Sequence, residues 1–148
     1  MKTILVPVDL SSATTRVSDA ARDLAKLIHA RLLFVHIVQP QPLYPGDFLA
    51  FDAGEVAEAA QAEEKRAARR LHALARRYAS RKIPVRTWQG TGQPAGEILS
   101  QAAASKADYI VIGSHGHGAA YDLLIGSAAQ GVLRKARCPM LVIPIKRR

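Results

Sequence analysis

The chain has 148 residues, of which 49% are hydrophobic, which suits a single domain over 1–148 with a buried core of its own. Its apolar runs stop well short of the ~20 residues that a membrane-spanning helix needs, so the composition argues against a membrane protein. The single cysteine, Cys138, excludes an internal disulfide and is typical of a cytoplasmic protein, in which we expect this thiol to be buried and inert.

The net charge of +9 would suit a nucleic-acid partner, and much of the positive charge lies between residues 63 and 82. Glu63 and Glu64 are close enough in sequence to pair with Arg66 and Arg70 on a helix surface. Aromatic residues, on which nucleic-acid modules stack bases, make up only 5% of the chain. We therefore interpret the segment as an amphipathic helix with a solvated basic side, and we do not expect nucleic acid as a partner. Its apolar stripe recurs at helical spacing in Ala60, Ala67, Leu71, Leu74 and Tyr78.

The hydrophobic pattern alternates between strand and helix along the chain. Helices are predicted after Ser11 or Ser12, which can cap a helix, across the basic segment, from near Pro94, and over 127–137. Gly131 lies inside the last helix, where glycine costs about 1 kcal/mol relative to alanine, so we expect a close packing contact there. A proline-rich stretch over 39–55 is long enough to be a lid. Strands are predicted at 3–8, 31–38, around 83–90, at 108–113 and at 139–145.

Strands joined by helical crossovers run parallel, with helices on both faces of the sheet. The pattern thus predicts an α/β fold, a single doubly wound, five-stranded parallel sheet. The order 3-2-1-4-5 is the economical arrangement, because it puts the first and fourth strands where the winding reverses. Ligands bind at this point, beyond the carboxyl ends of the strands. Asp9 leaves the first strand and Gly113 the fourth, so we expect a site in the crevice between them.

A glycine-rich stretch follows the fourth strand. Gly113 and Gly116 let a ligand approach the backbone closely, and Gly126 with Ser127 opens a helix whose first amides have no intrahelical partner. Such amides, with the Ser127 hydroxyl, would seat a phosphate group. Glycine and serine before a helix are also an ordinary capping signal, and spacing alone does not decide between the two interpretations.

The pattern Gly113-x-x-Gly116, then nine residues, then Gly126-Ser127, resembles the ATP-binding signature of the universal stress protein family. The resemblance extends over nearly the whole chain. The stretches 4–11, 32–38, 92–99 and 132–144 are similar to the family's opening strand with its aspartate, its second strand, its Gly-x-Pro segment, and its closing helix and strand.

The resemblance implies a Rossmann-like domain that binds ATP, with Mg²⁺ on the phosphates, and that forms homodimers through the C-terminal strand. It implies that the residues of the first strand's end contact adenine and ribose, and that Ile37 lies against the base. The end of the fourth strand would hold ribose and phosphates, and the start of the last helix the phosphates. The residues so implied are Pro7, Val8, Asp9, Ile37, Ile112, Gly113, His115, Gly116, Gly126, Ser127, Ala128 and Ala129.

One position departs from the family pattern. Many nucleotide-binding relatives have arginine or lysine after the second glycine, whereas this chain has His117. A neutral imidazole gives phosphates less positive charge, so affinity for ATP should be lower, or another adenine nucleotide preferred, and binding should strengthen as the pH falls. Asp9 can also be a turn or cap acceptor, and His115 can instead fix its own loop.

The favoured function is that of an adenine-nucleotide-binding regulatory protein of the stress response, with little or no turnover, because the sequence has neither a Walker lysine motif nor an obvious catalytic base. The alternatives are a dimeric scaffold that never binds nucleotide, and a slow ATP hydrolase or nucleotidyl-transfer enzyme suggested by His115 and His117. A metal site built from His36, His115 and His117 ranks below these.

Overall fold

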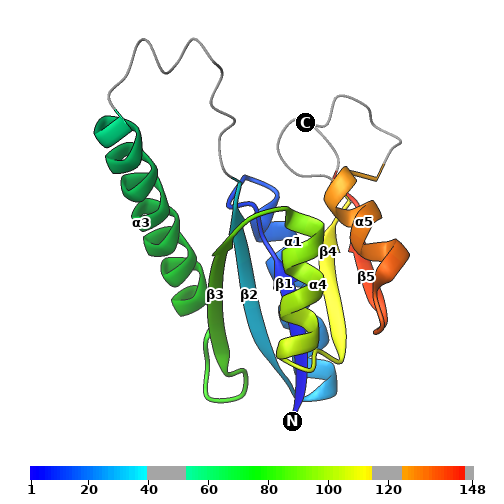
Figure 1. Ribbon diagram of the computed structural model, residues 1–148. Helices are drawn as coiled ribbons and strands as arrows, with labels where there is room; N and C mark the ends of the chain where they lie inside the picture. The colour runs from blue at the N-terminus through cyan, green and yellow to red at the C-terminus, as the bar shows by residue number, and fades with distance from the viewer. Residues whose placement is uncertain (40–52, 115–124, 146–148) are drawn as a thin grey trace.

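The computed structural model describes residues 1–39, 53–114 and 125–145. Its strands form one parallel sheet in the order β3-β2-β1-β4-β5, which confirms the predicted fold class and strand order (Figure 1). The strands are β1 (Lys2–Pro7), β2 (Ala30–Val38), β3 (Val85–Thr91), β4 (Tyr109–Gly113) and β5 (Met140–Ile143). The helices are α1 (Thr14–Ile28), α3 (Ala53–Tyr78), α4 (Pro94–Ala104) and α5 (Ser127–Lys135).

Each face of the sheet is covered by its own helices and has its own core. Alternate residues of β1 point to opposite faces, so that Ile4 belongs to one core and Leu5 to the other. Both are fully buried, as expected for a central strand of a parallel sheet. Apolar side chains of α1 and α3 fill the first core, which contains Val17, Ala21, Ala67, Leu71 and Phe34. Those of α4 and α5 fill the second, which contains Ile98, Ala129, Val132 and Ile110.

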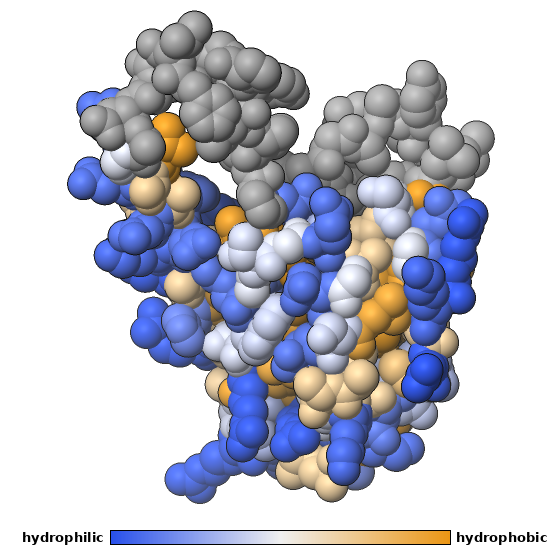
Figure 2. Space-filling view, viewed as in Figure 1, coloured by the Kyte–Doolittle hydropathy of each residue, from blue (hydrophilic) through white to orange (hydrophobic). Residues whose placement is uncertain are grey.

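The basic helix is α3, which begins ten residues before the segment 63–82 described from the sequence. Its acidic and basic side chains form only some of the predicted pairs. Glu63 does pair with Arg66, over 3.5 Å. Arg70 instead donates to the carbonyl oxygen of Leu10, and Glu64 Oε1 accepts a hydrogen bond from the Thr91 hydroxyl at 3.2 Å. Two surface residues of α3 therefore tie the helix to the rest of the fold. The side of α3 seen in Figure 2 is largely hydrophilic.

The apolar stripe of α3 is confirmed at Ala67, Leu71 and Tyr78, which are buried, whereas Ala60 is exposed. The first helix begins at Thr14 with Ala13 as its N-cap and no side-chain cap, so the predicted capping by Ser11 or Ser12 is wrong. The Ser11 hydroxyl accepts the N–H of Ala13 at 3.1 Å and contributes to the turn before the helix. Proline does occupy the first turn of α4, as predicted.

The close packing predicted at Gly131 is also confirmed. A β-carbon at this position would lie 2.8 Å from the Cβ of Ala95, closer than carbon atoms can approach, so only glycine lets α5 sit against α4 at this distance.

Cys138 is half-buried beside the α4–α5 core, so the prediction of a buried thiol is right in part. Burial, with a smaller effect of the Asp108 carboxylate, raises the pKa of the Cys138 thiol and keeps it in the less reactive protonated form. Within the described ranges, no helix is long and apolar enough to cross a membrane. Most of the lid predicted over 39–55 lies outside the described residues.

Candidate functional site

A cleft of about 460 Å³ opens at the carboxyl edge of the sheet. It lies where β1 has β2 on one side and β4 on the other, which is the point of reversal expected to hold a ligand. Its volume is in the range of small-molecule sites. The walls come from the ends of three strands and the first turns of three helices. They are Pro7, Val8, Asp9, Ala13, Thr14, Val17, His36, Ile37, Gln39, Pro94, Ile98, Ile112, Gly113, Ser114, Gly126, Ser127, Ala128 and Ala129.

The strand ends give the cleft an apolar lining. Val8 and Ile112 are buried to 7% and 6% exposure, so they are held in fixed positions by the cores below. Ile37 is half-buried, and Ile98 contributes from α4. Such a surface between two strands suits a flat, mostly apolar group, such as an aromatic ring system.

Asp9 brings a carboxylate to this lining and is held by its own loop. Its Oδ1 accepts hydrogen bonds from the N–H of Ser11 at 3.0 Å and from the hydroxyl of Thr14 at 3.3 Å. The interpretation of Asp9 as a turn acceptor is therefore correct. The same contacts fix the carboxylate at the mouth of the cleft, where it can accept further hydrogen bonds from hydroxyl or amino groups of a ligand.

His36 fixes the other side of this loop. Its Nδ1 lies 2.9 Å from the carbonyl oxygen of Val8, and because a carbonyl can only accept, Nδ1–H is the donor. The N–H of Val8 in turn donates to the Val35 carbonyl at 2.9 Å. The peptide units beside Asp9 are thus held by hydrogen bonds from β2.

The opposite end of the cleft is the start of α5. Gly126 is the N-cap and no side chain caps the helix. The Gly126 N–H donates to the Ser114 carbonyl at 2.7 Å, so this amide is used within the fold. The amides of Ser127, Ala128 and Ala129 are in the first turn, where α-helical N–H groups have no intrahelical acceptor. All three residues line the cleft, so this end offers hydrogen-bond donors and partial positive charge.

Ser114 anchors the start of the glycine-rich stretch to β5. Its N–H donates to the Ile143 carbonyl at 2.8 Å, and its Oγ accepts the N–H of Ile145 at 3.0 Å. The end of β4 and the start of α5 are consequently joined through one serine. This arrangement sets the distance between Gly113 and the first amides of α5.

The structure brings together in this cleft every predicted site residue that it describes. Their contacts with a ligand remain a prediction. His115, Gly116 and His117 lie outside the described residues. The residues that are gathered are Pro7, Val8, Asp9, Ile37, Ile112, Gly113, Gly126, Ser127, Ala128 and Ala129.

Sequence reasoning missed the helical side of the cleft. Thr14 and Val17 come from α1, and Pro94 and Ile98 from α4. A usable signal was present, because a helix that directly follows a strand end in a parallel sheet begins beside that end. His36 was not assigned to this cleft. Among the described residues no group of His, Cys, Asp or Glu could hold a metal ion, and a site that includes His115 and His117 falls outside them.

The chain belongs to the universal stress protein family, whose model matches residues 1–144. A universal stress protein of Thermus aquaticus is 36% identical over 142 residues, which cover 96% of this chain and 98% of the relative. The solved structure of the universal stress protein UspA from Lactobacillus plantarum has a TM-score of 0.80 at 25% identity and covers 96% of this chain and 97% of that one.

Two other solved universal stress proteins are complexes with adenine nucleotides. One contains cAMP, with a TM-score of 0.60 at 22% identity over 96% of this chain and 95% of that one. The other, from Archaeoglobus fulgidus, contains dAMP, with a TM-score of 0.59 at 22% identity over 96% of this chain and 97% of that one. At such identities the likeness establishes the shared fold.

Proposed function

We propose that the cleft binds an adenine nucleotide, with ATP carrying Mg²⁺ on its phosphates as the physiological form. The observation that carries the proposal is the opposite polarity of the two ends of one cleft. A carboxylate stands beside an apolar lining at the Asp9 end, and the first-turn amide donors of a helix without a side-chain cap stand at the α5 end. A nucleotide has the matching asymmetry, since its base and sugar are neutral and its phosphates are anionic.

The base and sugar belong at the Asp9 end. A carboxylate repels phosphates and accepts hydrogen bonds from ribose hydroxyls or from an exocyclic amino group. The apolar strand ends, with Ile37 and Ile112, offer a surface to the face of a purine. Universal stress proteins that bind cAMP and dAMP support adenine as the base.

The phosphates belong at the start of α5. Backbone amides at a helix N-terminus and the Ser127 hydroxyl bind oxyanions without a side-chain cation. None of the described residues that line the cleft is a lysine or arginine. Phosphoryl transfer normally needs such a cation clamp together with a base, so we infer binding with little or no turnover, as in a regulatory protein of the stress response.

The biological unit that we propose is a cytoplasmic homodimer joined through β5. This strand is the edge of the sheet, and it leaves Leu141 at 42% exposure, with Leu133 of α5 at 49%. An apolar edge strand is a natural surface for pairing with a second copy. A reducing compartment suits the free thiol of Cys138.

Isothermal titration calorimetry of ligand-free protein with MgATP, AMP and MgGTP tests the proposal. We expect saturable binding of ATP, weaker binding of GTP, and retained adenine nucleotide in native mass spectra of freshly purified protein. Ser127→Ala should weaken ATP binding by roughly tenfold, because a hydrogen bond to a charged group is lost, and should change adenosine binding little. Asp9→Asn keeps the loop's acceptor and should weaken adenosine and ATP alike.

Ser100→Ala, at an exposed serine of α4, is the matched control and should bind as the unchanged protein does. His117→Ala, with titrations at pH 8 and pH 6, tests whether the imidazole contributes to phosphate binding; equal affinities throughout would remove it from the site. Absence of heat with millimolar MgATP would leave the nucleotide-independent scaffold as the function.

A further inference from the structure

A second hollow of about 490 Å³ lies at the opposite end of the sheet from the nucleotide cleft. It is bordered by β1, β2 and β3 on one side and by the last turn of α4 and the residues after it on the other. In Figure 1, α4 stands before the middle of the sheet and no helix stands before β3, so the hollow occupies the uncovered part of this face. We call it the Trp88 groove; its lining includes Arg31, Leu33, Arg86, Trp88, Gln101 and Lys106.

Strand register explains why these side chains meet. Thr3 pairs with Arg31, Leu33 with Arg86, and Val35 with Trp88. Paired residues of neighbouring parallel strands point to the same face, and alternate residues of one strand share a face. Leu33 and Val35 belong to the core under α4. Arg31 and Arg86 therefore project on the α4 side from adjacent strands, and Trp88 follows Arg86 on the same side of β3.

The groove is cationic, with one carboxylate close by, that of Asp108, whose Oδ2 accepts the N–H of Thr3 at 2.7 Å. Arg31, Arg86 and Lys106 line it, and no aspartate or glutamate does. The ion pairs among the described residues involve Arg22 and Arg66, and none of the groove's cations. Arg31 Nε is held by the Thr3 hydroxyl at 2.8 Å, which fixes the plane of this guanidinium beside the sheet. Positive charges that share a hollow repel one another unless an anion joins them.

Trp88 gives the groove a fixed aromatic wall. The ring is half-buried against the core under α4, and it lies along β3 so closely that a β-carbon on Gly90 would be 2.2 Å from it. The glycine is therefore what allows the indole to lie flat on the strand. A flat aromatic surface beside guanidinium groups is a combination that holds anions with an apolar or planar portion.

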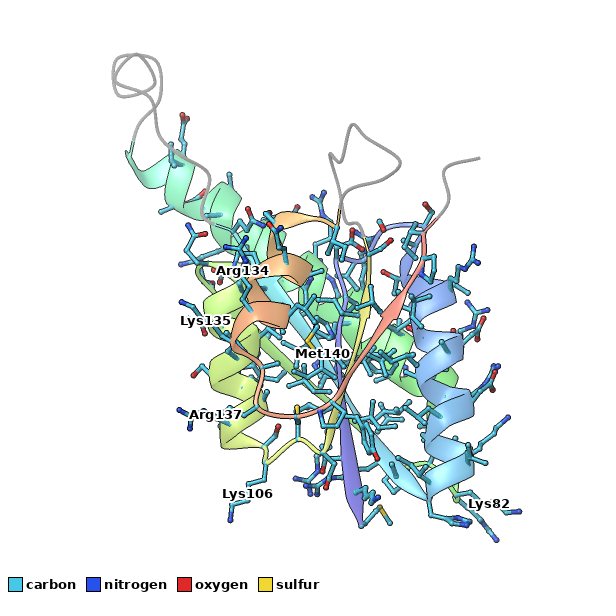
Figure 3. All side chains as sticks on the ribbon, turned by 90° about the vertical axis from the view of Figure 1, so that its right-hand side faces the viewer. Lys82, Lys106, Arg134, Lys135, Arg137 and Met140 are labelled. Carbon is cyan, nitrogen blue, oxygen red and sulfur yellow. The ribbon has the colours of Figure 1, made fainter. Side chains whose placement is uncertain are left out.

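We propose that the Trp88 groove is a second ligand site, which binds a small molecule bearing an oxyanion, a phosphoryl or carboxylate group, independently of the nucleotide cleft. The guanidinium groups of Arg31 and Arg86 contact the oxyanion, since their planar fork matches such groups. Lys106 adds charge from the end of α4, where Figure 3 shows its side chain extending from the helix end. The body of the ligand lies against Trp88.

The test uses the fluorescence of Trp88, which is the only tryptophan of the chain and lines this groove. The protein is first saturated with MgATP, so that the nucleotide cleft does not compete, and then titrated with inorganic pyrophosphate and, in a second arm, with citrate. Sodium chloride at matched ionic strength is the reference. We expect a saturable change in Trp88 emission with pyrophosphate, with citrate, or with both, and the stronger arm identifies the anion class.

The variants Arg86→Gln and Lys106→Gln remove exposed cations of the groove, and each should weaken binding by roughly two- to fivefold, the usual effect of a partly solvated charge pair. The matched controls, Lys82→Gln and Arg137→Gln, each remove one positive charge at an exposed position that does not line the groove, and should leave the titration unchanged. Circular dichroism confirms that each variant is folded.

The proposal is overturned if Trp88 emission changes equally with sodium chloride and with the anions at matched ionic strength. It is also overturned if Arg86→Gln binds pyrophosphate and citrate as the unchanged protein does. If calorimetry shows that the protein binds no nucleotide, the same titration is carried out without MgATP. Failure of the nucleotide proposal is therefore seen in calorimetry and failure of this one in Trp88 emission, so the two remain distinguishable.

Discussion

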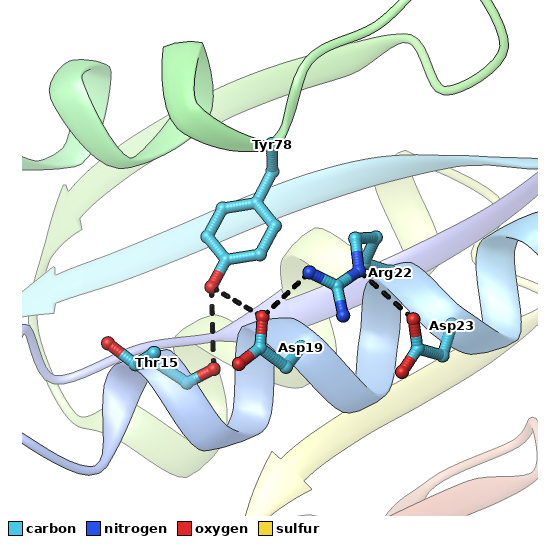
Figure 4. A network of polar contacts seen from close by, with 5 residues as sticks. All are labelled: Thr15, Asp19, Arg22, Asp23 and Tyr78. Atoms are coloured by element: carbon cyan, nitrogen blue, oxygen red, sulfur yellow. Dashed lines mark hydrogen bonds and ion pairs between the residues drawn. The ribbon is translucent and has the colours of Figure 1, made fainter.

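The hydroxyl of Tyr78 donates a hydrogen bond to Asp19 Oδ1 over 3.0 Å, which joins the last residue of α3 to the middle of α1 (Figure 4). The same carboxylate oxygen pairs with Arg22 at 3.0 Å. The Tyr78 side chain is 5% exposed and its ring lies 5.7 Å from that of Phe34. One tyrosine therefore closes the first core and bonds the two helices that cover it.

Removal of this hydroxyl should destabilise the protein without disturbing the ring packing. Tyr78→Phe keeps the contact with Phe34 and loses the hydrogen bond to Asp19, so the free energy of unfolding should fall by about 1 kcal/mol at neutral pH. Urea denaturation followed by circular dichroism measures the change. Unaltered stability would mean that solvent satisfies Asp19 equally well.

The pH dependence of this difference follows from the pKa of Tyr78. Burial, aided by the hydrogen bond to Asp19, raises the pKa of Tyr78 above its ordinary value of 10.0. The folded protein then holds this proton more tightly than the unfolded chain does, so the contribution is complete below that value and is lost as the pH rises above it. The free energy of unfolding of the unchanged protein should thus fall more steeply than that of Tyr78→Phe as the pH rises above about 10.

Arg70 provides a second link from α3, this time to the loop that carries Asp9. Its guanidinium donates to the carbonyl of Leu10, whose backbone has the left-handed φ of 58° that side chains other than glycine's disfavour. Arg70→Met should therefore cost about 1 kcal/mol of stability and loosen the loop. Hydrogen exchange of the Ser11 amide, which donates to Asp9, should accelerate.

Arg69→Met, which removes an exposed arginine from the neighbouring position, is the control for Arg70. If both variants gave the same stability and the same Ser11 exchange rate, general loss of charge from α3 would explain the effect, and the contact with Leu10 would not.

The sheet could be predicted because each strand and each crossover helix is recognised from residues that are adjacent in the sequence. The run from Ile4 to Val8 is apolar throughout, as is typical of a strand buried on both faces, and crossover helices fix the parallel direction. Contacts across the fold could not be predicted in the same way. Glu64 and Arg70 lie six residues apart on one helix and could be expected to pair on its surface. They bind Thr91 and Leu10 instead, which only the packing of α3 brings near.

The residues of the candidate site also fall into those that the sequence could predict and those that depend on packing. Asp9, Gly113 and Gly126 follow or precede elements that can be recognised in the sequence, so their meeting in one cleft follows from topology. Thr14 and Ile98 come from helices that begin beside strand ends, but which of their side chains enter the cleft depends on the angle at which α1 and α4 lie on the sheet. The bond of His36 to the Val8 carbonyl depends on the register of β1 and β2.

Substitution by alanine should have opposite effects on stability at Gly131, which packs against Ala95, and at Gly96, which faces open space. Gly131→Ala should destabilise the protein by about 1–2 kcal/mol, because overpacking outweighs the better helix propensity of alanine. Gly96→Ala, where a β-carbon meets open space, should stabilise it by about 0.5–1 kcal/mol. Thermal unfolding monitored by circular dichroism measures both.

The compensating pair makes this prediction specific. Ala95→Gly removes the atom that a new methyl group on Gly131 would strike, so the double variant should regain much of the lost stability. Additive losses in the double variant would show that the helices do not meet at these positions.

Substitution of the exposed Leu141 tests whether two copies of the chain are joined at β5. Leu141→Lys places a charge on the edge strand, where pairing with a second copy would bury it, so we expect the dissociation constant of the dimer to rise by at least about tenfold. Leu27→Lys changes an even more exposed leucine, at 78%, in the last turns of α1, where lysine suits the helix dipole. Sedimentation velocity over a range of concentrations should show the first variant shifted to monomers and the second unchanged; equal behaviour of the two would place the dimer contact elsewhere.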